Sequence, residues 1–139
     1  MIDKDLMEAK LDIIERDLRF VKENYKGIKP EEVEKDFKGY QALKFSLFEI
    51  IEACLDIANH IIAAKRLERI ETYSEMFTSL GKNGIISTEL AEELSKMARF
   101  RNLLVHRYAA VDVERVMEIV NEHLVDVAEY MMEIKKWMG

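Results

Sequence analysis

The sequence contains very few of the residues that interrupt helices or cross-link chains. Its 139 residues include one proline, five glycines and one cysteine. Scarce proline and glycine favour long helices over many short strands. The single cysteine, Cys54, excludes a disulfide framework within the chain, which indicates a reducing compartment and a cytoplasmic protein. The length and the 49% hydrophobic content predict one globular domain that covers residues 1–139.

The sequence also lacks a segment suited to a lipid bilayer. The N-terminus is charged from Asp3 onward and has no apolar signal core. The most apolar window, residues 43–64, is long enough to span a membrane, but five ionisable side chains interrupt it: Lys44, Glu49, Glu52, Asp56 and His60. Several charges within a bilayer are costly, so we predict no membrane partner.

Apolar residues recur at spacings of three and four along most of the chain, which is typical of helices. Strand-like alternation is absent from the sequence. The expected helices are one that ends near Gly27, a short one from Pro30 to Gly39, one from about Tyr40 to about Arg66, one from Thr72 to about Leu80, one capped by Ser87 or Thr88, and a last one capped by Asp112. We therefore predict an all-α fold, an antiparallel bundle of about five helices.

The helix expected over residues 40–66 has an unusually narrow polar face. A helix that is apolar on most sides must be buried on most sides, so it is either the central helix of a monomer or part of a dimer interface. Its polar stripe consists of Glu49, Glu52, Asp56, Asn59 and His60. Without a second row of ligands we predict no metal site there. The carboxylates are interpreted as a solvated face or a protein contact, and His60 as a hydrogen-bonding group.

The chain is acidic overall, with a net charge of −6, yet it contains no Asp or Glu from Lys96 to Val111. A cationic segment within an acidic protein indicates a binding site for an anionic ligand. Arg101 lies in this segment, at a position where the helical pattern requires an apolar residue. An arginine in a buried stripe needs an anionic partner or a wet interface to compensate for its desolvation.

Two further polar side chains accompany Arg101 on the same helix. Asn102 and His106 are four residues apart, so the amide can hydrogen-bond the imidazole and fix its tautomer. Arg101 and His106 diverge by about 140° on an ideal helix. They can converge if the arginine wraps round the helix, if the helix bulges, or if one substrate spans both. A buried structural network is the alternative interpretation.

The pattern Arg101-x-x-x-x-His106-x-Tyr108, with Asn102 after the arginine, resembles the signature of HEPN-superfamily proteins of the HepT type. The resemblance extends over nearly the whole chain. It includes four flanking segments in the same order: residues 57–61, Thr72-Tyr73, residues 84–86 and Val111-Asp112. HepT-type proteins are small all-α toxins encoded beside a minimal nucleotidyltransferase (MNT-type) antitoxin.

The resemblance implies a homodimeric, metal-independent endoribonuclease that needs no cofactor and cleaves RNA through attack of the ribose 2′-OH, in a cleft between protomers. Arg101 would hold the scissile phosphate and His106 would be the acid or base. Asn102 would position these groups, and Arg107 would add positive charge for RNA. Tyr108 would receive AMP from the antitoxin, which switches the toxin off. The alternatives are a non-catalytic binding subunit of a two-component nucleotidyltransferase and a helical dimerisation protein.

Overall fold

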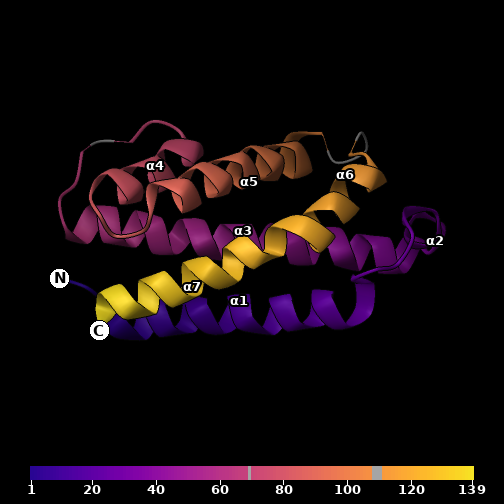
Figure 1. The fold of residues 1–139 in the computed structure, drawn as a ribbon, viewed down its shortest axis with the longest axis horizontal. Coiled ribbons are helices and arrows are strands. Elements are labelled where there is room, and N and C mark those ends of the chain that lie inside the picture. The colour runs from indigo at the N-terminus through magenta and orange to yellow at the C-terminus, as the bar shows by residue number, and fades with distance from the viewer. Residues whose placement is uncertain (69, 108–110) are drawn as a thin grey trace.

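A computed structural model describes residues 1–68, 70–107 and 111–139 (Figure 1). All regular structure in these ranges is helical, which confirms the predicted all-α fold. The elements in chain order are α1 (Lys4–Tyr25), α2 (Pro30–Lys35), α3 (Phe37–Ala64), α4 (Tyr73–Lys82), α5 (Thr88–His106), α6 (Val113–Glu118), the π-helical segment η2 (Ile119–His123) and α7 (Leu124–Met138). No helix among them is both long enough and apolar enough to cross a bilayer.

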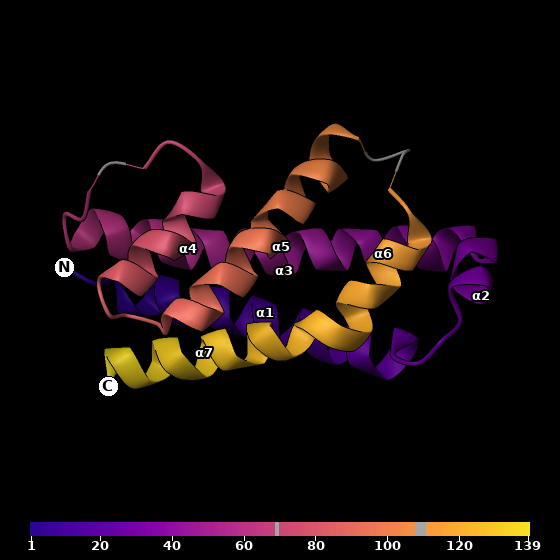
Figure 2. The same cartoon turned by 45° about the horizontal axis from the view of Figure 1, so that its top comes forward.

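The helix α3 lies at the centre of the bundle. Figures 1 and 2 show α1 running antiparallel along one side of α3 while α4 and α5 lie on another side, and the last helix crosses the bundle so that both termini lie at the same end. Buried side chains occur along the whole of α3, from Tyr40 to Ile62, as its mostly apolar surface requires. The sequence left open whether this helix is central or part of a dimer interface, and the structure shows it in the central position (Figures 1 and 2).

The core around α3 is filled by large side chains from the neighbouring helices. Phe77 and Tyr130 meet edge to face with their ring centres 5.6 Å apart. The Tyr130 hydroxyl donates a hydrogen bond of 2.9 Å to the backbone carbonyl of Cys54, so its polar end is satisfied inside the core. Burial raises the pKa of the Cys54 thiol, which keeps it protonated and makes this cysteine a small core side chain.

The predicted caps of two helices are confirmed by their hydrogen bonds. Ser87 Oγ accepts from the backbone N–H of Leu90 at 3.2 Å at the start of α5. Asp112 Oδ1 accepts from the backbone N–H of Glu114 at 3.0 Å at the start of α6. A side-chain acceptor at this position satisfies one of the free amides of the first turn, which fixes where each helix begins.

Two boundaries differ from the prediction. Gly39 does not separate two helices but lies in the first turn of α3, whose N-cap is Asp36. The Asp36 carboxylate accepts from the Gly39 N–H at 3.0 Å, and a Cβ at Gly39 would overlap that carboxylate, so glycine permits the cap. The last helix is also not uniform, because η2 inserts a π-helical turn between α6 and α7.

Candidate active site

Arg101 lies in the C-terminal half of α5 and is held from three sides. Its side chain is only 11% exposed, and its Nε donates to Glu52 Oε1 of α3 at 2.5 Å. The guanidinium carbon lies 4.6 Å from the centre of the Tyr73 ring and 5.6 Å from that of Phe48. Nη1 donates to Asn102 Oδ1 at 3.3 Å. The structure thus supplies the anionic partner that the sequence required for this arginine, and two aromatic faces in addition.

His106 is the last residue of α5 and its side chain is exposed. Together with Asn102 it forms one wall of a pocket of about 430 Å³, whose opposite wall comes from α4 and the residues before it. The amide oxygen of Asn102 accepts from Arg101, and no hydrogen bond joins Asn102 to the imidazole in the described part of the chain. Asn102 therefore contacts the arginine directly and the histidine only as a neighbour in the pocket wall.

Arg107 is the C-cap of α5, and its backbone N–H donates to the carbonyl of Leu103 at 2.9 Å. Its side chain is exposed, where it adds positive charge beside His106. Tyr108, the predicted site of AMP attachment, lies outside the described residues. Arg101 and His106 leave the helix on different sides, as their spacing predicted, and Tyr73 connects them because it packs on Arg101 and also lines the His106 pocket.

The acidic stripe of α3 is paired within the chain. Glu52 holds the motif arginine, while Glu49 Oε1 lies 2.7 Å from Arg16 Nη2 and Asp56 Oδ2 lies 2.8 Å from Lys10 Nζ. Asp56 is exposed, as a solvated face requires, but each of the three carboxylates also has a cationic partner within the chain, which the sequence did not predict. The carboxylates fix α1 and α5 to α3, since their cationic partners come from those two helices.

Comparison with known proteins decides which family carries this arrangement. The family model "Ribonuclease HepT-like" matches residues 14–134, which include the whole of α3 and the motif of α5. The chain belongs to the HepT-like ribonuclease family. The family predicted from the motif is thereby confirmed, and with it ribonuclease as the class of enzyme.

Relatives of this HepT-like ribonuclease match it along nearly their whole length. It is 30% identical to the mRNA nuclease HepT of Shewanella oneidensis over 94% of this chain and 97% of the relative. It is 27% identical to the tRNA nuclease HepT of Aphanizomenon flos-aquae over 99% and 92% of the two chains. A solved structure of the tri-AMPylated Shewanella oneidensis HEPN toxin in complex with MNT antitoxin superposes with a TM-score of 0.86, 29% identity, and coverage of 98% and 99%.

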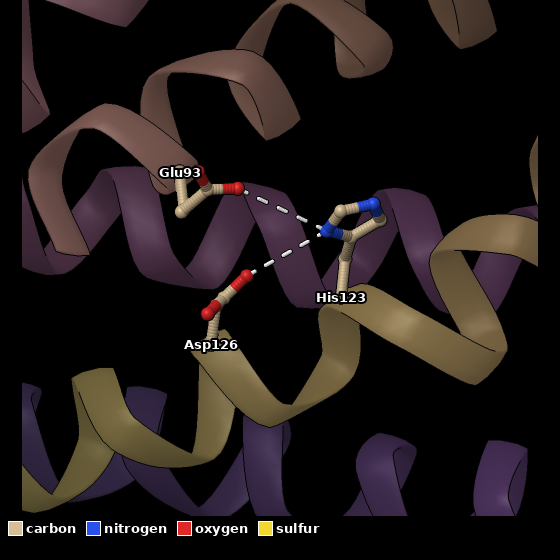
Figure 3. A group of neighbouring side chains, drawn as sticks. All are labelled: Glu93, His123 and Asp126. Atoms are coloured by element: carbon tan, nitrogen blue, oxygen red, sulfur yellow. Dashed lines mark ion pairs between the residues drawn. The ribbon is translucent and has the colours of Figure 1, made fainter. Parts of the chain in front are cut away.

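The other histidines of this HepT-like chain lie apart from the motif. His60 Nε2 accepts from the backbone N–H of Asp3 at 2.9 Å, which confirms the predicted hydrogen-bonding role and ties the N-terminus to α3. His123 is half-buried at the end of η2 among three carboxylates. Its Nδ1 lies 3.9 Å from Glu93 and 3.7 Å from Asp126 (Figure 3). Its Nε2 lies 3.6 Å from Glu118.

The His123 group is the place in the described chain where a cation could find mixed nitrogen and oxygen ligands. Glu93, His123 and Asp126 each offer one atom, and the three atoms lie within 4.8 Å of one another. Lys96 Nζ already lies 3.0 Å from Glu93 Oε1, and Arg115 pairs with the neighbouring Glu118, so two of the carboxylates around His123 have cationic partners within the chain. Glu93 lies about 20 Å along α5 from His106, so this group takes no part in the chemistry at the motif.

Sequence reasoning missed two residues that shape the site. Glu52 was placed on the polar stripe of α3, and Tyr73 was noted only as part of a segment shared with the family. The arginine in an apolar stripe was the signal for a carboxylate partner on a neighbouring helix. Nothing local could identify Glu52, which is 49 positions away in the chain. Tyr73 directly follows the N-cap Thr72, so its position at the start of α4 was predictable but its contact with Arg101 was not.

Proposed function

We propose that this protein is the RNA-cleaving toxin of a toxin–antitoxin pair whose antitoxin is an MNT-type nucleotidyltransferase. The single observation that supports a catalytic role best is Arg101, a cation that Glu52 and two rings fix on the helix that ends with His106. Family membership supports RNA as the substrate. The similar Shewanella oneidensis toxin was solved with an MNT antitoxin, which supports the partner. We also propose a cytoplasmic location, where both the RNA substrate and the antitoxin are present.

The chemistry follows from the donors at the end of α5. His106 takes the proton of a ribose 2′-OH, and the 2′ oxygen forms a bond to phosphorus while the bond from phosphorus to the 5′ oxygen breaks. The leaving 5′ oxygen receives a proton, and the products carry a 2′,3′-cyclic phosphate and a 5′-OH. Arg101 stabilises the negative charge on the phosphorane oxygens. Glu52 engages Nε and Asn102 engages Nη1, so among the described contacts Nη2 is the guanidinium nitrogen that remains to donate to a phosphate oxygen.

One chain supplies one motif histidine, whereas this reaction needs both a base and an acid. A second copy facing the first across a two-fold axis would supply the other histidine. Exposed apolar side chains beside the motif support such a dimer: Phe45 on α3 and Leu103 and Val105 on α5. In a single chain these apolar side chains face solvent, and a dimer could bury them between protomers.

The antitoxin would silence the enzyme by attaching AMP to Tyr108. The motif places this phenol two residues after His106, so the added phosphates would occupy the position of the substrate phosphate and meet the same cationic groups. Arg107 lies between the two residues and would hold the modified tyrosine there. This regulation is supported by the AMPylated state in which the similar toxin was solved.

The decisive experiment incubates purified protein with single-stranded RNA in excess chelator, beside His106→Ala and a His60→Ala control. We expect wild type and His60→Ala to cleave and His106→Ala to lose at least about 100-fold in rate. A 2′-deoxy nucleotide at the cut site should stop the reaction. Equal cleavage by wild type and His106→Ala would refute the assignment of His106 as the catalytic acid or base. Tight nucleotide binding without cleavage would favour the binding-subunit alternative.

Co-expression with the adjacent nucleotidyltransferase tests the regulation. The intact mass should rise by whole AMP units, and the modification should map to Tyr108. The Tyr108→Phe variant should keep the unmodified mass and should remain toxic in the presence of the antitoxin. An added mass that persists in Tyr108→Phe would assign the modification to another residue.

A further inference from the structure

The pocket beside His106 has walls of two different kinds. One wall is the motif face of α5, with Asn102 and His106. The other comes from the residues around the start of α4: Ile70, Glu71, Thr72, Tyr73 and Met76. Figure 2 shows the start of α4 alongside the C-terminal half of α5. At about 430 Å³ the pocket falls within the range of small-molecule sites.

The α4 wall suits a flat, uncharged group and repels a phosphate. Ile70 and Met76 are apolar, and Tyr73 presents an aromatic ring that is 42% exposed. The only fixed charge among the described lining residues is the carboxylate of Glu71, which disfavours an anion. The cation that would bind a phosphate, Arg101, lies behind Tyr73. Charge therefore divides the region into a phosphate position and a position for a neutral aromatic group.

Tyr73 is held in place before any ligand arrives. The Arg101 guanidinium packs over its ring at 4.6 Å, and the first turn of α4 is fixed by the Thr72 cap, whose Oγ1 accepts from the N–H of Glu75. A fixed aromatic ring is the usual platform on which proteins stack the bases of single-stranded RNA. The same ring contacts the phosphate-binding arginine, so a base on Tyr73 and a phosphate on Arg101 would belong to neighbouring parts of one strand.

We propose that this pocket is a nucleobase subsite, in which a base of single-stranded RNA adjoining the scissile phosphate stacks on Tyr73. The proposal rests on the proposed function for the identity of the ligand. Within it, Tyr73 is a substrate-binding residue and Glu71 accepts hydrogen bonds from exocyclic amino groups, which favours adenine and cytosine over uracil. Binding of the base next to His106 brings the adjoining ribose to the imidazole.

The test measures equilibrium binding, so it does not depend on cleavage. The probe is a 2′-O-methyl adenosine hexanucleotide, which cannot react at the 2′ position, compared with the same hexanucleotide without its bases. The variants are Tyr73→Ala, Tyr73→Phe and, as a matched control, Phe37→Ala, whose ring is exposed in α3 outside this pocket. We expect Tyr73→Ala to weaken binding of the intact probe about tenfold, and Tyr73→Phe and Phe37→Ala to bind within about twofold of wild type.

The probe without bases separates stacking from an indirect effect on Arg101. We expect wild type and Tyr73→Ala to bind it equally. If Tyr73→Ala weakens both probes by the same factor, the ring only supports the arginine and the nucleobase subsite is refuted. If it weakens neither, the subsite is refuted as well. Tight, Tyr73-dependent binding of the intact probe by a protein that cleaves no RNA would retain the subsite and overturn the proposed catalytic function alone.

Discussion

The helix α5 carries two charged groups whose construction differs. At its C-terminal end, Arg101 is 11% exposed and touches Glu52 at 2.5 Å. Nearer its N-terminal end, Glu93 faces His123, which is 30% exposed. The His123 ring nitrogens lie 3.6 to 3.9 Å from the carboxylates of Glu93, Glu118 and Asp126. The first contact is a hydrogen bond between a guanidinium and a carboxylate, whereas the second set is too long for hydrogen bonds.

This difference separates an arrangement that is fixed before a ligand arrives from one that solvent can rearrange. The Arg101 side chain is oriented by a carboxylate, an amide and two rings, so binding a phosphate there requires little reorganisation. The contacts of the His123 ring with its three carboxylates are all longer than a hydrogen bond. Loose ion pairs of this kind contribute little to stability. Substitutions should therefore have large effects at the first group and small effects at the second.

The largest effect is expected for Arg101→Ala, which removes the phosphate-binding cation. The rate constant kcat/KM on single-stranded RNA should fall by about 100-fold or more. Arg101→Lys keeps the charge but loses the planar guanidinium that contacts Glu52 and Asn102. Its activity should therefore lie between that of wild type and that of Arg101→Ala. His123→Ala is the control and should cleave like wild type. Wild-type activity in Arg101→Ala would contradict the role of this arginine.

The next effect is on folding and is expected for Glu52→Gln. This substitution leaves a largely buried guanidinium without its counter-charge, so the free energy of unfolding should fall by about 1 to 3 kcal/mol. The matched control is Asp56→Asn, one turn further along α3, where the partner Lys10 forms a more exposed pair. That variant should lose less than about 0.5 kcal/mol. Urea unfolding measures both, and equal losses would show that burial does not distinguish the two pairs.

The comparison also shows how far the sequence determines the site. The caps Ser87 and Asp112 were predictable because a cap depends on residues within one turn of it. Arg101 was identified as an anomaly because a charge in an apolar stripe violates a local pattern. The identity of its carboxylate partner was not predictable, because it depends on how α3 and α5 pack and not on either helix alone.

The His123 group was not predictable for a different reason. The apolar stripe of the last helix continues through Val116, Val120 and Leu124 without a visible break, so the sequence indicated one regular helix. His123 is the last residue of the π-helical turn η2, and its Nδ1 lies 3.9 Å from Glu93 of α5. A backbone insertion of this kind leaves no residue-type signal, since its cause is the packing of the helix as a whole.

A smaller effect is expected for His123→Gln, which tests whether the long ion pairs matter. Its free energy of unfolding should change by less than about 1 kcal/mol, and its kcat/KM should equal that of wild type. Urea unfolding and RNA cleavage are measured on the same preparation. A loss comparable to that of Glu52→Gln would mean that the His123 group is as tightly built in solution as the Arg101 group.

The smallest effect is expected for Asp126→Asn and appears only as a function of pH. Partial burial, and then the neighbouring charge of Glu93, raise the pKa of the Asp126 carboxyl above its ordinary value. The folded state then binds this proton more tightly than the unfolded state does, so the contribution of Asp126 to stability is greatest below the ordinary pKa and decreases as pH rises through the raised one.

The asparagine variant lacks this decrease in stability with rising pH. Relative to wild type it should gain less than about 1 kcal/mol between acidic and neutral pH, measured by urea unfolding. A relative loss at neutral pH would mean that attraction to His123 outweighs the desolvation of the carboxylate.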